Sequence, residues 1–266
     1  MNIWKNTTIL DDYSHQYNFI NKKNIADIIL LGSRKITVDD FPKLKAVFRA
    51  GVGRDNIPSN INKDIQIVYP SKQTMEIVYD ETSNYTCNLI INMSYQNVGT
   101  VNPWNRRIRK QFSRKTLLVV GCGNIGSRVA NKMKSFLNVV TFDNLHNEET
   151  DLKEMIRVSD YISLHIPGDL HNKSFFDSEK LSLMKNGSII INTSRGSIVN
   201  ENDLYNELKT GRIKAFFDVF WNEPYSGKLM EYFPKYFRVS PHVSSSCYEF
   251  INSINTDFKK FLSNLS

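Results

Sequence analysis

The sequence has few cysteines and no long apolar segment. Its 266 residues include three cysteines, Cys87, Cys122 and Cys247, which lie far apart in the chain. Their number and spacing fit neither a disulfide framework nor a metal-binding motif. No apolar run approaches the roughly 18 residues that span a bilayer, and the first residues lack the basic and then apolar pattern of a signal peptide. We therefore expect a reduced, cytoplasmic protein with no membrane partner and no bound metal.

Acidic residues are the minority among the charged residues. The 34 Lys and Arg against 27 Asp and Glu give a formal net charge of +7, which could indicate a nucleic-acid partner. The densest basic cluster consists of Arg106, Arg107, Arg109, Lys110, Arg114 and Lys115. It lacks the interleaved aromatic residues of a base-stacking surface, so we interpret it as a solvated connector and expect no nucleic-acid partner. A basic surface would also attract a small anionic substrate.

The length and the order of the predicted elements indicate two domains. The first segment alternates short apolar strands with polar, helix-compatible sequence, as small α/β domains do. These strands are predicted at Thr8–Leu10, Ile28–Leu31, Ala46–Phe48 and Ile65–Tyr69. A helix over Glu81–Ser94 and an irregular connector over Asn97–Ser113 follow. We expect a first domain over residues 1–90 and a second domain over residues 91–243.

The C-terminal segment, residues 244–266, has the apolar periodicity of an amphipathic helix. Its apolar face consists of Phe250, Ile251, Ile254, Phe258 and Phe261. Such a face has to be buried against another element. We expect it to dock on the first domain and complete it.

The segment Lys115–Asp143 has the pattern of a dinucleotide-binding strand, turn and helix. An apolar strand precedes Gly121, Gly123 and Gly126 in the order G-x-G-x-x-G, and a second strand ends at Asp143. The helix between them has its predicted apolar face at Ile125, Val129, Met133 and Phe136. The first glycine permits a tight turn, the second lets a pyrophosphate approach the backbone, and the third lets the helix pack on the sheet. The Asp143 carboxylate can accept hydrogen bonds from ribose hydroxyls and repels a 2′-phosphate, which predicts NAD rather than NADP.

Six strands alternate with helices from Thr116 onward. They are predicted at Thr116–Val120, Asn138–Phe142, Tyr161–Ile166, Ser188–Asn192, Ala215–Phe220 and Arg238–Ser240. In the helix after the fourth strand, Asn200 is the predicted cap, Asp203 its capping-box partner and Gly211 the terminator. The predicted fold is α/β with two Rossmann-like domains. One has a doubly wound six-stranded parallel sheet that binds NAD, and the other is a smaller flavodoxin-like substrate domain.

Three reactive side chains follow the last three predicted strands. Arg195, Glu223 and His242 come after the fourth, fifth and sixth strands. Because the carboxyl ends of parallel strands meet at one edge of a sheet, we expect the three to converge beside the nicotinamide. Arg195 can bind a carboxylate and polarise the neighbouring carbonyl, and His242 can exchange a proton with the substrate oxygen. Glu223 can hold the imidazole and favour its protonated form. Each residue alone could instead be a surface Arg, a helix-capping acid or a core His.

Five motifs together resemble the D-isomer-specific 2-hydroxyacid dehydrogenase family. They are GCGNIG, SLHIP, NTSRGSIV, GRIKAFFDVFWNEP and SPHVSSS, and the resemblance covers Lys43–Ser246. It implies that Arg195, Glu223 and His242 are the catalytic set. It also implies cofactor contacts at Asn124, Ile125, Asp143, His165, Ile166, Pro167, Thr193, Ser194 and Asp218.

Further expectations come from the same resemblance. Asp218 would face the nicotinamide carboxamide, and the backbone at Val52 and Gly53 would bind the substrate carboxylate together with Arg195 and His242. The glycines of this loop alone would indicate only a turn or a nest of N–H groups. The family is usually dimeric, which implies a homodimer.

These observations predict an NAD-dependent oxidoreductase that interconverts a 2-oxo acid and a D-2-hydroxy acid. An NAD(H)-sensing, corepressor-like binding protein of the same fold is the alternative, because such proteins can keep the three side chains. The Glu–His pair disfavours a formate- or phosphonate-oxidising relative. The acid stays open, because Gly32 stands where phosphoglycerate-type members have an Arg, and Arg34 or Arg54 could replace that charge.

Overall fold

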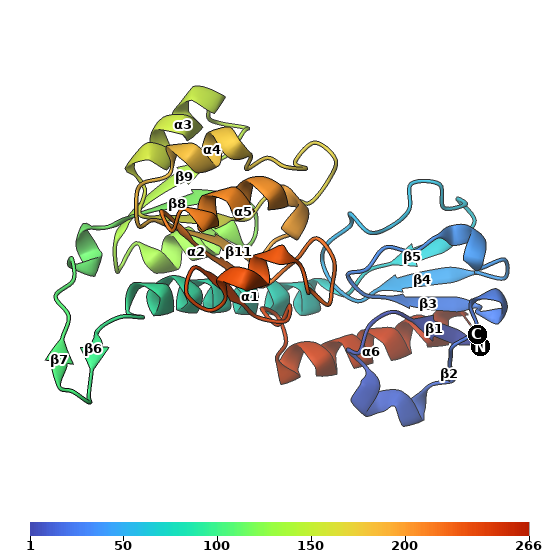
Figure 1. Ribbon diagram of the computed structural model, residues 1–266. Coiled ribbons are helices and arrows are strands. Elements are labelled where there is room, and N and C mark those ends of the chain that lie inside the picture. The colour runs from blue at the N-terminus through green and yellow to red at the C-terminus, as the bar shows by residue number, and fades with distance from the viewer. Residues whose placement is uncertain (266) are drawn as a thin grey trace. The chain divides into compact units, whose positions relative to one another are not determined.

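The computed structural model describes residues 1–265 and divides into two compact units. Unit 1 comprises Met1–Glu81 and the segment from Ser245 onward, and unit 2 comprises Thr82–Ser244. Helix α1 (Lys72–Ser94) runs through the boundary between them (Figure 1). The expected boundary at residue 90 lies in the same helix. That the units act as substrate and cofactor domains stays a prediction.

Unit 1 is built on a five-stranded parallel sheet in the order β2-β1-β3-β4-β5. Its strands are β1 Ile3–Lys5, β2 Phe19–Ile20, β3 Ile28–Leu31, β4 Ala46–Arg49 and β5 Gln66–Val68. This order is that of flavodoxin-like folds. The prediction of a flavodoxin-like first domain is therefore confirmed at the level of topology.

One local prediction for unit 1 is wrong. Thr8–Leu10 is a turn rather than a strand, because Leu10 fills the core from the start of a short helix while Ile3 pairs with Ile28 as the first strand. The polar, helix-compatible segments between β1 and β4 form short 3-10 helices. These are η1 Asp11–Gln16, η2 Lys23–Ile25 and η3 Val38–Asp40.

Helix α6 (Tyr248–Leu265) covers one face of the unit 1 sheet. The Phe258 ring lies 5.2 Å from the ring of Phe48 in β4 and 5.1 Å from that of Tyr17. Asp257 accepts hydrogen bonds from the Ser71 N–H (2.8 Å) and the Thr74 hydroxyl (2.7 Å) at the start of α1. The C-terminal helix therefore belongs to the same core as the N-terminal strands.

Unit 2 has a six-stranded parallel sheet in the order β13-β12-β11-β10-β8-β9. Its strands are β8 Thr116–Val120, β9 Asn138–Phe142, β10 Tyr161–Leu164, β11 Ile189–Asn192, β12 Lys214–Phe217 and β13 Phe237–Val239. The first two have the predicted bounds, and the others differ by one to three residues at their ends. The predicted six-stranded parallel sheet is confirmed.

Helices cover both faces of the unit 2 sheet. They are α2 Gly126–Met133, α3 Glu149–Val158, α4 Ser178–Leu183 and α5 Glu201–Lys209. Leu117 and Val119 of β8 pack with α1 and α2, whereas Leu118 and Val120 pack with α3, α4 and α5. This alternation makes the sheet doubly wound, with α3 and α4 on one side of it and α1 on the other in Figure 1. The order of strands reverses between β8 and β10.

Two details of these helices differ from the prediction. Asn200 does cap α5, since its side chain accepts the N–H groups of Asn202 (3.0 Å) and Asp203 (3.2 Å). Asp203 is not its capping-box partner, because the Asp203 carboxylate accepts the N–H of Ser178 at the start of α4 (2.9 Å). Phe136, predicted on the apolar face of α2, lies beyond the end of the helix and is half exposed.

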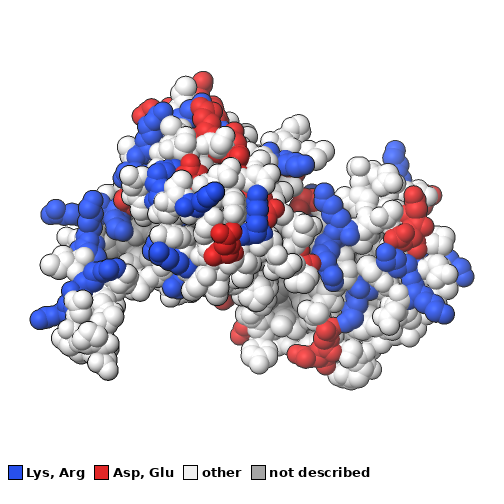
Figure 2. Space-filling view, viewed as in Figure 1, with Lys and Arg blue, Asp and Glu red and all other residues white. Residues whose placement is uncertain are grey.

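The connector before β8 is more regular than predicted. Gly99–Thr100 (β6) and Asn105–Arg106 (β7) pair as an antiparallel hairpin, and the 3-10 helix η4 (Phe112–Arg114) follows. The hairpin projects away from the sheet of its unit, and Lys and Arg gather there (Figures 1 and 2). Among the described residues, no helix combines the length and the apolar content that a membrane span requires.

Candidate active site

The glycine loop after β8 has the close packing that its motif predicts. Gly121 has a φ of +93°, and a Cβ there would lie 2.7 Å from the carbonyl oxygen of His165. A Cβ on Gly126 would lie 1.9 Å from the Gly121 carbonyl oxygen. At Gly123, by contrast, a Cβ would meet no atom within 4 Å. The first and third glycines are therefore required by packing, and the second leaves the backbone open at the start of α2, where N–H groups can bind a phosphate.

Asp143 lies at the end of β9, directly beside this loop. Its carboxylate accepts the N–H of Cys122 (2.8 Å) and the N–H of Leu145 (3.1 Å). These two hydrogen bonds hold the pKa of Asp143 below its usual value, so the carboxylate is ionised at neutral pH. An ionised acid at this position fits the ribose of NAD and repels the 2′-phosphate of NADP.

The segment His165–Pro167 borders the loop from the end of β10. The His165 imidazole Nε2 lies 2.8 Å from the Ser163 hydroxyl, and its Cβ packs against Gly126. Enclosure by the surrounding residues lowers the pKa of His165, so its ring is neutral. The glycine loop thus lies between Asp143 and His165 at the point where the strand order reverses. Dinucleotides bind at this point in doubly wound sheets, and the residues present fit that cofactor.

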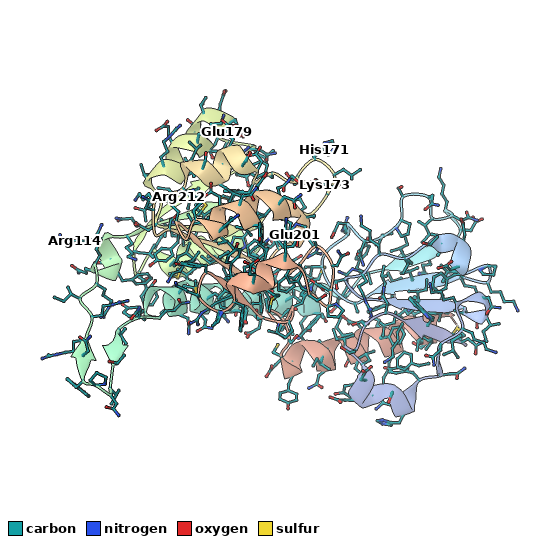
Figure 3. The ribbon with its side chains drawn as sticks, viewed as in Figure 1. Arg114, His171, Lys173, Glu179, Glu201 and Arg212 are labelled. Atoms are coloured by element: carbon teal, nitrogen blue, oxygen red, sulfur yellow. The ribbon has the colours of Figure 1, made fainter. Side chains whose placement is uncertain are left out.

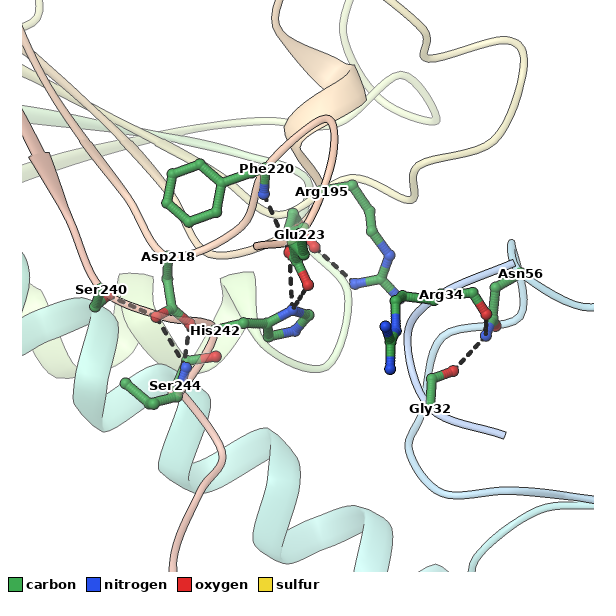
Figure 4. A network of polar contacts seen from close by, with 12 residues as sticks. Gly32, Arg34, Asn56, Arg195, Asp218, Phe220, Glu223, Ser240, His242 and Ser244 are labelled. Atoms are coloured by element: carbon green, nitrogen blue, oxygen red, sulfur yellow. Dashed lines mark hydrogen bonds and ion pairs between the residues drawn. The ribbon is translucent and has the colours of Figure 1, made fainter. Parts of the chain in front are cut away.

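Glu223 and His242 form a hydrogen-bonded pair after β12 and β13. The His242 Nδ1 lies 2.9 and 3.0 Å from the two carboxylate oxygens of Glu223 (Figure 4). One of these oxygens also accepts the N–H of Phe220 (3.2 Å). Burial alone would raise the pKa of Glu223, but its bonds to His242 and Phe220 and the nearby charge of Arg195 outweigh it, and the pKa is lowered. The pair has the geometry of an imidazole oriented by a carboxylate.

Arg195 follows β11 and lies in the same unit. Its guanidinium donates to the Ser194 carbonyl (2.6 Å), and its stem packs so closely on Gly168 that a Cβ there would lie 2.4 Å from the Arg195 Cγ. Figure 4 shows its side chain near those of Glu223 and His242, and its charge contributes to the lowered pKa of Glu223. That the three meet beside a nicotinamide stays a prediction. Their chemical roles stay predictions.

Asn192 shapes the turn that carries Thr193, Ser194 and Arg195. Its side chain accepts the Ser194 N–H (3.0 Å) and donates to the Arg195 carbonyl (2.8 Å). Thr193 is buried, with its hydroxyl 2.9 Å from that of Thr86 in α1. The predictions from sequence missed both Asn192 and Gly168. The signal for Asn192 was an amide at a strand end, which favours a turn.

Asp218, at the end of β12, is completely buried. Its carboxylate accepts the Ser240 hydroxyl (2.5 Å), the Val243 N–H (3.0 Å) and the Ser244 N–H (2.9 Å). All three donors lie in the loop that carries His242. The Asp218 oxygens that were expected to face the nicotinamide thus already accept hydrogen bonds within unit 2.

The loop after β4 in unit 1 contains the expected carboxylate site at Val52 and Gly53. The buried Arg49 donates through Nε to the Gly53 carbonyl (3.0 Å) and to the Asn56 side chain (3.0 Å). A Cβ on Gly51 would lie 2.7 Å from the Arg49 guanidinium. A buried guanidinium therefore supports this loop, a role of Arg49 that was not predicted from the sequence.

The remaining histidines of unit 2 do not join these groups. His146 and His171 are exposed, and Figure 3 shows His171 on the loop after β10. The three cysteines are unpaired with one another. Within residues 1–265, no three His, Cys, Asp or Glu side chains cluster as metal ligands.

Comparison with known proteins identifies the family. Residues 90–244 match the model of the D-isomer specific 2-hydroxyacid dehydrogenase NAD binding domain. The D-3-phosphoglycerate dehydrogenase of Methanocaldococcus jannaschii is 30% identical over 77% of this chain and 43% of its own length. The hydroxypyruvate reductase of Thermotoga maritima is 28% identical over 84% of this chain and 78% of its own length.

A solved structure shares the fold of the whole chain. The D-lactate dehydrogenase of Aquifex aeolicus, complexed with NAD and lactic acid, superposes with a TM-score of 0.81 at 21% identity. The match covers 100% of this chain and 95% of that one. The matched domain contains the glycine loop, and the strand order of both sheets fits the same kind of fold. The chain belongs to the D-isomer specific 2-hydroxyacid dehydrogenase family, a family of NAD-dependent oxidoreductases, and carries its NAD-binding domain.

Proposed function

We propose that this chain interconverts a small 2-oxo acid and a D-2-hydroxy acid with NAD(H), using Arg195, Glu223 and His242. The observation that carries the proposal is the Glu223–His242 pair, with an Nδ1–Oε2 distance of 2.9 Å, beside the charge of Arg195. A guanidinium and a carboxylate-oriented imidazole at the carboxyl ends of adjacent strands suit hydride transfer to a carbonyl next to a carboxylate.

The dinucleotide would be held by the glycine loop and the segments around it. The residues are Gly121, Gly123, Asn124, Ile125, Gly126, Asp143, His165, Ile166, Pro167, Thr193 and Ser194. When bound, the reduced nicotinamide supplies the hydride. Ionised Asp143 would accept hydrogen bonds from the ribose hydroxyls, and the N–H groups at the start of α2 would bind the pyrophosphate.

Arg195 would bind and polarise the substrate. Its planar fork of N–H donors can bind the acid's carboxylate in a bidentate manner and draw charge from the carbonyl oxygen. The Val52–Gly53 backbone of unit 1, supported by Arg49, would supply the second contact to the carboxylate. Gly168 leaves the space that the Arg195 stem occupies.

His242 would act as the acid and base of the reaction. With Nδ1 bonded to Glu223, the other ring nitrogen, Nε2, is the atom that donates a proton to the substrate oxygen during reduction and accepts it during oxidation. Glu223 would fix the orientation of the ring through this hydrogen bond.

Replacement of His242 by Ala tests this assignment. We expect turnover to fall by roughly 100-fold or more, because general acid–base catalysis contributes about that much, while NADH affinity stays within about twofold. Steady-state rates and NADH fluorescence titration measure the two quantities. Full activity of the variant would refute the role of His242.

A panel of 2-oxo acids with NADH tests the function itself. Glyoxylate, hydroxypyruvate, phosphohydroxypyruvate and longer 2-oxo acids form the panel, because Arg34 and Arg54 leave open whether a second anionic group is bound. Turnover of at least one acid is expected. NADH binding without turnover of any acid would instead favour the NAD(H)-sensing, corepressor-like protein.

A further inference from the structure

We propose that Asp218 is a positioning residue that holds the loop of His242 in its reactive conformation. This inference rests on the proposed function of His242 as the acid and base. It differs from the implied role of Asp218 as a ligand of the nicotinamide carboxamide.

The Asp218 carboxylate binds the His242 loop on both sides of His242. Before His242, the Ser240 hydroxyl donates to Oδ1 (2.5 Å); after it, the Val243 N–H donates to Oδ1 (3.0 Å) and the Ser244 N–H to Oδ2 (2.9 Å) (Figure 4). Asp218 itself is fixed by its own N–H, which donates to the Asn192 carbonyl (2.9 Å). The carboxylate therefore fixes the loop on both sides of the histidine. We call these three hydrogen bonds the clamp.

The conformation so held is unfavourable for a histidine. His242 has a φ of +55°, in the left-handed region, where its Cβ is crowded by the backbone. Its N–H donates to the Ser240 carbonyl (3.0 Å), which makes the turn tight. Strained residues of this kind persist only where surrounding contacts enforce them, and they gather at functional sites. The three bonds to Asp218 are the contacts that enforce this one.

The strain has a direct consequence for the imidazole. The left-handed backbone determines the direction of the His242 side chain and so brings its Nδ1 within 2.9 Å of Glu223. Without the clamp, His242 can relax to a negative φ, which turns the ring away from Glu223. Asp218 is also fully buried, and the three hydrogen bonds that its carboxylate accepts all come from the loop of His242.

The test is Asp218→Asn in the full chain. An amide presents N–H groups as well as an oxygen, so it cannot accept all three loop donors. We expect kcat to fall roughly 10- to 100-fold from the misplaced ring, with the NADH dissociation constant within about twofold of the wild type. The ¹⁵N signals of His242 should lose the signature of a hydrogen bond from Nδ1 to Glu223. In a His242→Ala background, Asp218→Asn should lower turnover no further, because the group through which it acts is gone.

Each outcome decides the proposal. Three results would each overturn it. These are an unchanged His242 signal, a further loss of turnover in the His242→Ala background, and a roughly tenfold weaker NADH affinity with normal His242 signals. Ser240→Ala removes one of the three bonds and is expected to give a smaller change of the same kind, which keeps the test decisive if Asp218→Asn does not fold. The His242 signal needs no substrate, so it tests the clamp even if the chain reduces none of the acids.

Discussion

Glu223 and Asp143 are carboxylates of unit 2 whose surroundings favour the charged form. His242 and the Phe220 N–H stabilise the charge on Glu223, and two backbone N–H groups stabilise that on Asp143. Each pKa is lowered, so each ionised group stabilises the folded chain at neutral pH. This stabilisation is present above the ordinary pKa and is lost as the pH falls through the lowered pKa of the folded chain.

The pH dependence of stability tests this for Glu223. Glu223→Gln should lower the free energy of unfolding at pH 7, because Gln cannot form the charged pair with His242. The difference from wild type should be greatest above the ordinary pKa of 4.5 and should shrink as the pH falls further. Urea unfolding at pH 5, 4 and 3 measures it. A difference that does not shrink between pH 5 and pH 3 would contradict the lowered pKa.

Asp143→Asn tests the preference for NAD. We expect NADH to bind about tenfold more weakly, because a hydrogen bond to a charged group contributes about 1.5–3 kcal/mol. The affinity for NADPH should rise relative to that for NADH, because the charge that repels the 2′-phosphate of NADPH is removed. Fluorescence titrations with both dinucleotides measure the ratio, and Asp151→Asn at the start of α3 serves as the control. An unchanged ratio would show that Asp143 does not select the cofactor.

At the scale of elements, the contact between α2 and the loop after β8 determines the dinucleotide site. Gly121 and Gly126 touch, whereas Gly123 has free space where its Cβ would be. Glycines of one motif therefore meet different physical requirements. The first and third allow the strand and helix to approach, and the second leaves room for a ligand.

A pair of alanine variants separates these requirements. Gly126→Ala should destabilise the chain by about 1–3 kcal/mol, because its Cβ would lie 1.9 Å from the Gly121 carbonyl oxygen. Gly123→Ala should leave the melting temperature nearly unchanged but weaken NADH binding, because its methyl group would occupy the approach of the pyrophosphate. Thermal unfolding and NADH titration of both variants test the pair. Equal melting temperatures for the two variants would contradict the packing argument.

At the scale of the whole molecule, the two ends of the chain meet in unit 1. Helix α6 buries four apolar side chains against strands from the first 50 residues: Phe250, Ile254, Phe258 and Phe261. The stability of the unit that carries the proposed carboxylate loop therefore depends on the last element of the sequence. The expected homodimer and the expected cytoplasmic location stay predictions.

Phe258→Ala tests this dependence. Phe258 is fully buried, so its truncation should cost about 3–5 kcal/mol. We expect unit 1 to unfold at lower urea while NADH binding by unit 2 persists. Phe136→Ala is the matched control, since Phe136 is half exposed and should change stability by about 0.5 kcal/mol or less. Loss of NADH binding together with unit 1 structure would show that the units do not unfold independently.

The sequence by itself determined the features that follow from local pattern. Short apolar runs predict β8 and β9 with their correct bounds, and the glycine spacing predicts the strand–turn–helix. The position of Arg195, Glu223 and His242 after successive strands predicts that they lie close together. In each case the geometry of a single element, or the common direction of parallel strands, is enough to place the residue.

Only the tertiary structure decided the features that depend on distant partners. Leu10 fills a core as part of a turn, the Asp203 carboxylate binds another helix, and Arg49 supports its loop from within the core. Asp218 likewise bonds to three residues that are more than 20 positions away, in the loop where His242 has its left-handed backbone. A local pattern cannot predict these features, because a buried polar group is stabilised by whichever donors the fold brings to it.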